Sequence, residues 1–193
     1  MIYINEFAQV DENVELGQNT KIWHWTHISK NVKIGSNCVI GQNVFIGKNV
    51  KIGNGVKIQN NVSIFEGVEI YDDVFCGPSV VFTNVINPRA FIERKKEYKK
   101  TIVSKGVSIG ANSTIICGIQ IKDYAFIGAG SLVANDVKQF EKIYGNPATH
   151  KGWVTKEGNN INEMSLKNNT HVCPITNVNY FYDKYKKELN IDE

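Results

Sequence analysis

The sequence predicts an all-β protein, a parallel β-helix built from six-residue repeats, and three observations support this fold class. A branched or aliphatic residue recurs every six positions from Val10 to Ile70, Cys76 takes the next position, and the period resumes from Val103 to Val133. A second row of small or β-branched residues follows four positions after these anchors. Asn, Asp or Gly occupies the third position after the anchor in fifteen of the eighteen repeats.

Each repeat is expected to form one short strand and one corner. The two apolar rows lie two residues apart across each repeat junction, so their side chains alternate with the outward residue between them, as in a strand. Asn, Asp and Gly tolerate the positive φ that a sharp corner requires. Three strands and three corners complete a triangular coil of eighteen residues, so the eighteen repeats predict roughly six coils stacked around a dry aliphatic core.

Length and composition predict one cored domain with an accessory tail. The chain has 193 residues, of which 42% are hydrophobic, and we divide it into a β-helix domain at 1–152 and a tail at 153–193. The tail is expected to be irregular, with a strand near Cys173 to Tyr182 and a short charged helix. A net charge of +3 is mild and does not indicate a nucleic-acid partner.

Cysteine usage and hydropathy bear on the compartment. The four cysteines are far apart and form no CxxC pair, so we expect reduced thiols and neither a disulfide framework nor a metal site. The N-terminal residues carry acids and lack the basic and apolar regions of a signal peptide, and no segment has the apolar length that a membrane span needs. We therefore expect a cytoplasmic protein with no membrane partner.

One long insertion interrupts the repeats between Phe82 and Val103, and we assign it to a loop at 83–102. Loops of this size within a regular scaffold usually carry function. Its basic residues outnumber its two glutamates, Glu93 and Glu97, and are Arg89, Arg94, Lys95, Lys96, Lys99 and Lys100. Because guanidinium groups match phosphate oxygens bidentately, we expect Arg89 and Arg94 to bind an anionic substrate. The alternative is that the segment is a solvent-exposed basic loop with no binding role.

A second irregularity is the corner where Trp23, His24 and Trp25 replace the usual residues, followed by His27. Outward aromatic and imidazole side chains at a corner either stack on a substrate base or pack against a neighbouring subunit, and the sequence leaves both interpretations open. One pair of nearby histidines with no third ligand in register argues against zinc.

The repeats IGSNCV, IGQNVF, IGKNVK and IGNGVK resemble the hexapeptide-repeat acyltransferase family, and the likeness extends from residue 10 to about 148. It implies a left-handed parallel β-helix of hexapeptide repeats with one long inserted loop and a short irregular C-terminal tail. The segment GNPA at 145–148 resembles the family signature where the chain passes coenzyme A, although Gly145 and Pro147 also suit a simple turn. The acetyl-CoA contacts that we expect are Ala111, Ala129, Gly145, Asn146 and Pro147.

The motifs IWHWTHI, IQNNVSIFEGVEI and DDVFCGPSVVFTNVINPRAFIERKKEY together resemble one branch of this family, which acetylates the 3-amino group of nucleotide-linked 3-amino sugars for surface polysaccharides such as the O-antigen of lipopolysaccharide. The resemblance implies an acetyl-CoA-dependent N-acetyltransferase that works as a homotrimer with its sites between neighbouring subunits. We expect UDP-2-acetamido-3-amino-2,3-dideoxy-D-glucuronate as substrate, with a dTDP-3-amino-3,6-dideoxyhexose as the alternative. Substrate contacts are expected from His24, Trp25, His27, Arg89 and Arg94.

Catalysis by such an enzyme needs a group that orients the amine and a destination for its proton. Asn84, at the start of the loop, is the first candidate, because a carboxamide accepts an N–H but cannot act as a base. Glu93 is the second candidate, as a base, and a salt bridge explains it equally well. Other acetyl acceptors and a non-catalytic scaffold or sugar-binding protein remain alternatives.

Overall fold

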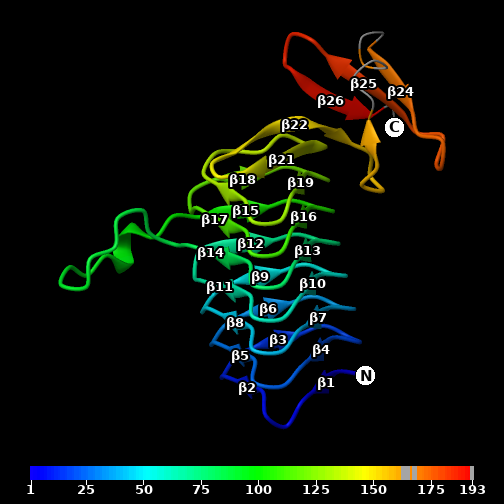
Figure 1. The fold of residues 1–193 in the computed structure, drawn as a ribbon. Coiled ribbons are helices and arrows are strands. Elements are labelled where there is room, and N and C mark those ends of the chain that lie inside the picture. The colour runs from blue at the N-terminus through cyan, green and yellow to red at the C-terminus, as the bar shows by residue number, and fades with distance from the viewer. Residues whose placement is uncertain (162–165, 167–168, 192–193) are drawn as a thin grey trace.

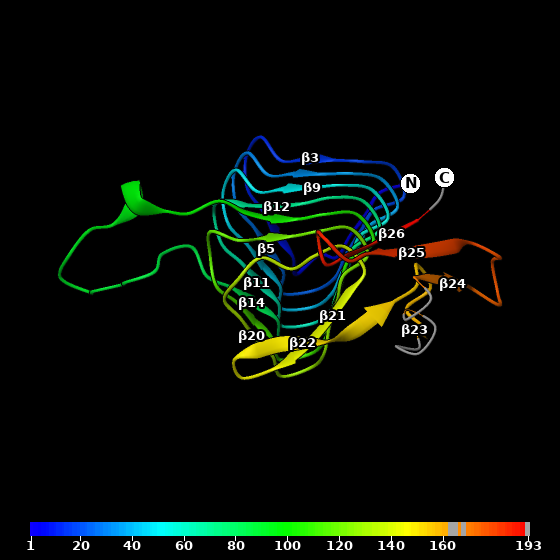
Figure 2. The same ribbon diagram turned by 90° about the horizontal axis from the view of Figure 1, so that it is seen from above.

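The computed structural model describes residues 1–161, 166 and 169–191, and it confirms the left-handed parallel β-helix. Short strands wind into a triangular prism whose coils stack along one axis, and the inserted loop projects sideways from the stack (Figure 1). Viewed from above, the coils superpose around a common interior (Figure 2). No helix among the described residues has the length and apolar character needed to cross a membrane.

The prism has three faces, which we name sheets A, B and C. Sheet A contains β1 (Tyr3–Ile4), β4 (Lys21–Ile22), β7 (Val39–Ile40), β10 (Lys57–Ile58), β13 (Phe75–Cys76), β16 (Ser108–Ile109), β19 (Phe126–Ile127) and β21 (Glu141–Gly145), extended by antiparallel β22 (Ala148–Val154) and β23 (Asn160–Ile161). Sheet B contains β2 (Gln9–Val10), β5 (His27–Ile28), β8 (Phe45–Ile46), β11 (Ser63–Ile64), β14 (Val81–Phe82), β17 (Thr114–Ile115) and β20 (Leu132–Val133). Sheet C contains β3 (Glu15–Leu16), β6 (Lys33–Ile34), β9 (Lys51–Ile52), β12 (Val68–Ile70), β15 (Thr101–Val103) and β18 (Gln120–Ile121).

The repeat runs further than the eighteen hexads indicate. Sheet A begins at β1, whose Ile4 pairs in register with Ile22, and its parallel part ends at β21, where Ile143 pairs with Ile127. The stack is about 8 turns deep, compared with the predicted six, because these terminal strands add to both ends of the counted series.

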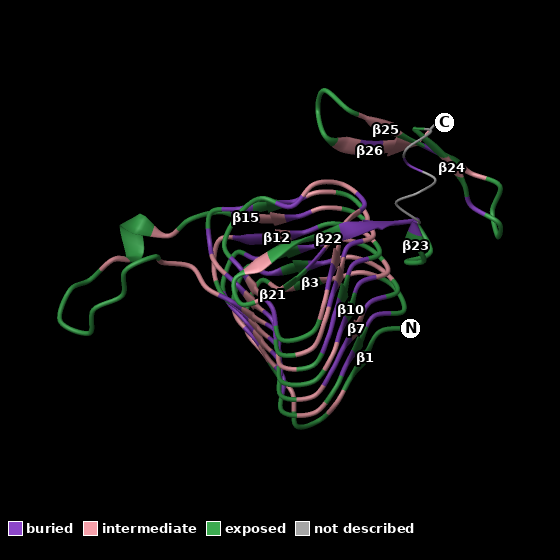
Figure 3. Ribbon diagram, turned by 45° about the horizontal axis from the view of Figure 1, so that its top comes forward, coloured by how far each residue is buried: buried purple, intermediate pink, exposed green. Residues whose placement is uncertain are grey.

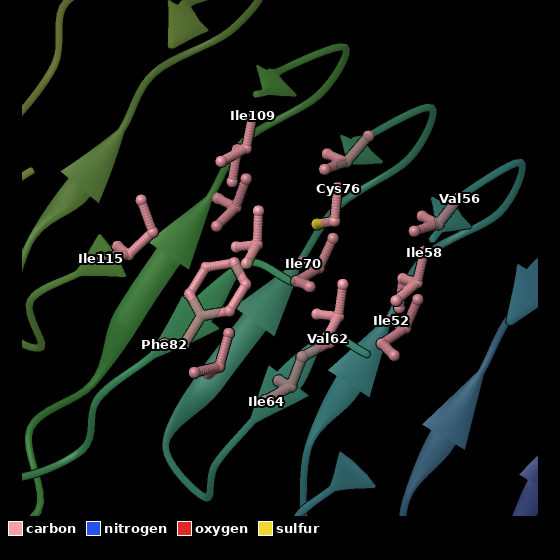
Figure 4. Close-up of a cluster of buried hydrophobic side chains, with 14 of the residues drawn as sticks. Ile52, Val56, Ile58, Val62, Ile64, Ile70, Cys76, Phe82, Ile109 and Ile115 are labelled. Carbon is pink, nitrogen blue, oxygen red and sulfur yellow. The ribbon is translucent and has the colours of Figure 1, made fainter. Parts of the chain in front are cut away.

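The anchor residues form the core. Pairing in register places Ile46 beside Ile64 and Ile64 beside Phe82, and all three side chains are fully buried. Figure 4 shows the same stacking for a larger group, with aliphatic side chains from successive coils pointing into one interior. Buried hydroxyls are satisfied locally: the Thr26 hydroxyl donates to the Gly41 carbonyl at 2.7 Å. The interior is therefore predominantly apolar, as the six-residue period predicts.

The corners adopt the predicted left-handed conformation. Positive φ occurs at the Asn corners, for example 54° at Asn43, and also at three aromatic residues that take the same position: Trp25 with 58°, Tyr124 with 56° and Phe140 with 59°. The asparagine side chains stack from coil to coil, since the Asn43 amide donates to Asn61 at 2.9 Å. The corner position dictates the backbone conformation even where the residue type does not favour it.

The C-terminal region is more regular than predicted. The predicted domain division at residue 152 falls within β22, which continues sheet A. Beyond it, β24 (Thr170–Val172), β25 (Asn179–Asp183) and β26 (Glu188–Ile191) form a separate antiparallel sheet. The strand expected near Cys173 to Tyr182 is present as β25, whereas the expected charged helix is wrong, because a turn and β26 follow it.

This small sheet closes the end of the prism. Phe140, at the last corner, packs edge-on against Tyr180 with ring centroids 5.4 Å apart, and it stacks on Tyr124 at the same distance. The Lys122 ammonium pairs with Glu188 at 3.0 Å. A second apolar cluster therefore covers the top of the main core. Tyr180 and Leu189 belong to this second cluster and are fully buried.

Candidate functional site

Two edges of sheet B carry the candidate site residues. We name the corner column that precedes the sheet B strands the AB edge, and the column that follows them the BC edge. Asn84 lies on the BC edge directly after β14, whereas Ala111 and Ala129 lie on the AB edge after β16 and β19. Within one chain, sheet B therefore separates the predicted acceptor and donor residues.

A groove with a volume of about 470 Å³ follows the BC edge. Residues from five coils line it, namely Asp11, Ser29, Lys30, Phe45, Gly47, Lys48, Phe65, Glu66, Asn84 and Tyr98. Asn84 and Tyr98 belong to the two ends of the inserted loop, which the Lys99 amide closes by donating to the Asn84 carbonyl at 2.9 Å. No hydrogen bond to a described residue engages the half-buried Asn84 carboxamide, so this group is available to a ligand in the groove.

The lower end of the groove contains an acid–imidazole pair. His27 Nε2 lies 3.2 Å from both carboxylate oxygens of Asp11, and the Gln9 amide donates to the same carboxylate at 3.1 Å. The hydrogen bonds from Gln9 and His27 lower the pKa of Asp11. The carboxylate is therefore ionised at neutral pH, and the imidazole donates to it from Nε2.

Aromatic rings extend from this pair along the groove. The Phe45 ring packs edge-on against His27 with centroids 5.6 Å apart, and Phe65 follows with its centroid 5.5 Å from Phe45. Phe65 retains 37% of its surface exposed. Because both rings stand on the outer face of the prism, they do not belong to the core, and they form one apolar wall of the groove.

The inserted loop extends away from its own prism. Its strand β15 begins at Thr101, so the loop proper spans 83–100 and contains a 3₁₀ helix, η1 (Lys95–Glu97). The Arg94 guanidinium donates to both Glu97 oxygens at 2.9 Å, while Glu93 is exposed and lies 3.8 Å from Lys95. The Arg89 guanidinium donates only to the carbonyl of Pro88 among the described residues. These three predicted residues do not line the groove of their own chain, and the loop that carries them projects away from the prism (Figure 2).

The AB edge carries the aromatic corner at its lower end. His24 lies between the two tryptophans, with its ring centroid 4.7 Å from Trp25 and 6.5 Å from Trp23. A hollow of about 320 Å³ adjoins Trp23 and His24 and extends to Asn60. Of the four clustered residues, only His27 is joined to the BC groove, through Asp11 and Phe45.

The upper part of the AB edge differs from the lower part in its free backbone amides. In the lower coils the side chain of the next coil satisfies the corner amide, since the Gln42 N–H donates to Asn60 Oδ1 at 3.0 Å. Pro78, Ala111 and Ala129 then replace asparagine in this column, and within residues 1–161 the amides of Ala111 and Ala129 donate to no protein acceptor. Small side chains beside open N–H groups suit the amide carbonyls of a pantetheine arm.

The β21–β22 hairpin closes the AB edge above Ala129. Asn146 and Pro147 form its turn directly after Gly145, the last residue of β21, and the Asn146–Pro147 peptide bond is cis. The neighbouring Tyr144 ring is 44% exposed and is approached by Lys151 Nζ at 5.2 Å and by Lys142 Nζ at 5.9 Å from its centroid. The turn thus continues the column of Ala111 and Ala129 and adds two cations to it.

Two family models match the repeat region. The model of the GMPPB C-terminal domain matches residues 22–110, and the model of the hexapeptide repeat of succinyl-transferase matches residues 100–134. Both matches lie within the repeats, and together they span residues 22–134. This agrees with the observed eighteen-residue coil and with the resemblance of the sequence motifs.

Among known proteins, this hexapeptide-repeat protein is similar to a dTDP-3-amino-3,6-dideoxy-α-D-galactopyranose 3-N-acetyltransferase of Aneurinibacillus thermoaerophilus, with 51% identity over 59 residues. The matched segment covers 31% of each chain, so the chain spans about a third of this curated relative. It is also similar in structure to PerB from Caulobacter crescentus in complex with CoA and GDP-perosamine, at 18% identity and a TM-score of 0.50, over 78% of this chain and 57% of PerB.

A third similar structure is a mutant of AntD, an N-acyltransferase from Bacillus cereus, in complex with dTDP and coenzyme A. It is 20% identical with a TM-score of 0.52, and 86% of each chain is covered. At these sequence identities, the similarity to the two solved structures establishes the fold of this chain and nothing more.

Sequence reasoning missed most of the groove. Lys30, Lys48, Glu66 and Asn84 follow one another at intervals of eighteen residues, so each lies one coil above the last. Counting back by this interval from Asn84 would have found them. Asp11, Ser29, Gly47 and Phe65 form a second column at the same interval, whereas Tyr98 has no such signal, because it enters the groove through the return of the loop.

Proposed function

We propose that this protein transfers the acetyl group of acetyl-CoA to the 3-amino group of a nucleotide-linked 3-amino sugar. The observation that carries the proposal is the Asn84 carboxamide, which makes no hydrogen bond with a described residue and lies at the end of a long groove beside the inserted loop. The open amides of Ala111 and Ala129 on the other edge of sheet B suit the acetyl-CoA arm. The name of the relative from Aneurinibacillus thermoaerophilus, which is 51% identical over the matched segment, supports the same reaction.

We propose that the active protein is a homotrimer. A single chain presents Asn84 and Ala111 on different edges of sheet B, so a complete site needs the BC edge of one subunit against the AB edge of the next. Such a head-to-tail contact closes into a ring when it is repeated by a rotation. The projecting loop supports this arrangement, because it stands away from its own prism (Figure 3) and carries Phe91, an apolar residue that is 84% exposed.

The reaction that we propose needs no acyl-enzyme. The lone pair of the neutral sugar amine attacks the thioester carbonyl, the C–N bond forms, and the C–S bond breaks as the tetrahedral intermediate collapses. The amine proton then passes to the departing thiolate, directly or through water. Asn84 accepts one amine N–H and so directs the lone pair at the carbonyl, while a backbone amide of the AB edge donates to the oxyanion.

Two sugars are candidates for the acceptor. The sequence motifs favour UDP-2-acetamido-3-amino-2,3-dideoxy-D-glucuronate, whereas the relative from Aneurinibacillus thermoaerophilus is named for a dTDP-linked 3-amino-3,6-dideoxyhexose. Arg89 and Arg94 would reach a substrate only across the subunit boundary, and an exposed guanidinium such as that of Arg89 suits a sugar carboxylate or a phosphate. The product of either reaction would enter a surface polysaccharide. The four free, buried cysteines are consistent with the reducing cytoplasm that we propose as the compartment.

Thiol release from acetyl-CoA, with the two sugar nucleotides offered in parallel, tests the function. We expect turnover with one of them and a loss of about tenfold in kcat/KM for Asn84→Ala, because one hydrogen bond to the amine is removed. Asn87→Ala, in the exposed part of the same loop, is the matched control and should keep full activity.

Three outcomes would count against parts of this proposal. Undiminished kcat/KM in Asn84→Ala would remove its orienting role. A changed pH profile in Glu93→Gln would mean that Glu93 is the base after all, against its exposed position. Failure of the folded protein to bind acetyl-CoA would favour a non-catalytic scaffold.

A further inference from the structure

The inserted loop replaces a hydrogen bond that ties regular corners of the BC edge together. In the lower coils the Asn49 amide donates to the carbonyl of Lys30, one coil below, at 3.2 Å. Counted along the repeat, the equivalent bond at the loop would join the Gly118 amide to the Asn84 carbonyl. The Asn84 carbonyl accepts instead from the Lys99 amide at 2.9 Å, where the loop returns to the prism. The corner above therefore needs other acceptors for its amides.

Two threonine hydroxyls provide these acceptors. The Cys117 amide donates to Thr83 Oγ1 at 3.0 Å, and the Gly118 amide donates to Thr101 Oγ1 at 3.2 Å. Thr83 is the first residue of the loop, and Thr101 is the first residue after it. Each hydroxyl therefore fixes one end of the loop to the coil above, and it satisfies an amide that would otherwise lack a partner.

Thr83 is the residue through which Asn84 is attached to the prism. The Thr83 amide donates to the Ile115 carbonyl at 3.0 Å, and its hydroxyl accepts from the Cys117 amide, so both its backbone and its side chain are fixed. The Asn84 carboxamide makes no hydrogen bond with a described residue, so the direction of this side chain depends on the backbone that carries it. A group that orients a reacting amine needs such support from its neighbours.

We infer that Thr83 is a positioning residue for the acetyl transfer, because its hydroxyl, fixed by the Cys117 amide, sets the direction in which Asn84 presents its carboxamide to the sugar amine. The inference rests on the proposed function for the role of Asn84. Thr83 does not line the groove, so it acts on the reaction through Asn84 and not through the substrate. Loss of its hydroxyl should therefore slow the chemical step and leave ground-state binding almost unchanged.

Steady-state kinetics of Thr83→Val and Thr83→Ser, with the sugar nucleotide that the parent protein acetylates, tests the inference. Valine keeps the shape of the side chain and removes the oxygen. Thr83→Val should lower kcat about tenfold while the KM of the sugar nucleotide stays within about twofold. Thr83→Ser keeps the hydroxyl, so its kcat should stay within about twofold of the parent value.

Thr20→Val is the matched control for a purely structural effect. The Thr20 hydroxyl also accepts a backbone amide from the coil above, that of Cys38 at 3.2 Å, but it lies between sheets C and A, away from the groove. Its loss should lower the Tm and leave kcat unchanged. Thr83→Val should also have almost no further effect on kcat in an Asn84→Ala background, because the group that Thr83 positions is then absent.

Unchanged kcat in Thr83→Val, an equal loss in Thr83→Ser, or additive losses in the double variant would each overturn the inference. A tenfold loss in Asn84→Ala beside unchanged kcat in Thr83→Val would overturn it while the proposed function stands. Absence of turnover by the folded parent protein with any nucleotide-linked 3-amino sugar would overturn the proposed function and, with it, the inference.

Discussion

Truncation of one anchor in the middle of the stack tests the physical basis of the fold. Ile64 is fully buried, and its register neighbours are Ile46 below and Phe82 above. Ile64→Ala removes three carbons, which costs about 2.4 kcal/mol at roughly 0.8 kcal/mol for each buried methylene. The neighbouring coils are fixed by their own backbone hydrogen bonds and collapse little, so the cavity raises the loss of unfolding free energy toward about 5 kcal/mol.

Thermal unfolding followed by circular dichroism at one fixed protein concentration measures the effect. At roughly 2–4 °C for each kcal/mol in a chain of this size, the Tm should fall by about 5–20 °C. Ser63→Ala in the same strand faces outward and should stay within about 0.5 kcal/mol of the parent protein. A loss below about 1 kcal/mol for Ile64→Ala would refute the rigid-coil reasoning, since it would mean that the stack relaxes into the cavity.

Three further predictions follow from the corners, the groove and the core. Trp25→Asn should raise the unfolding free energy by up to about 1 kcal/mol, because asparagine tolerates the positive φ at this corner better; a lower Tm would mean that the contact with His24 outweighs the backbone strain. The hydrogen bonds that lower the pKa of Asp11 stabilise the fold above the ordinary carboxyl pKa of about 3.9, and this contribution is lost as the pH falls through the lower folded value. Asp11→Asn should therefore flatten the acid limb of Tm against pH, and an unchanged limb would contradict the pairing. Burial raises the pKa of Cys76 to about 12, so the native protein should not react with a thiol reagent at pH 8, whereas all four thiols should react in guanidinium; rapid reaction of the native protein would contradict the buried core.

The repeat region could be predicted from the sequence because each of its features has a local cause. The anchor period, the inward second row and the asparagine corners each occur within six residues, so Ile58 and Asn43 can be assigned without knowledge of the rest of the chain. Handedness was the exception and came from the resemblance. Prediction from local sequence features failed at the tail. Tyr180 and Leu189 are buried there by strand pairing that no sequence repeat predicts.

The candidate site was predicted only in part. Asn84 stands out because it follows the last regular strand before the loop, and it does lie in the groove. The pairing of Asp11 with His27 joins a corner residue to a strand residue sixteen positions away, and its geometry depends on how that corner is turned. The direction of the loop depends on the local pair between Arg94 and Glu97 and on η1, so a count of its basic residues could not reveal it.

The corner insertion has a consequence for how such a protein can change. β14 still pairs with β11 and β17, and β15 still pairs with β12 and β18, although eighteen residues stand between the two halves of one coil. The backbone hydrogen bonds between the coils therefore do not depend on how many residues are inserted at a corner. Evolution can therefore lengthen, shorten or rewrite the segment from Thr83 to Lys100 without moving a single core residue. In this architecture a new acceptor preference can arise without first destabilising the scaffold.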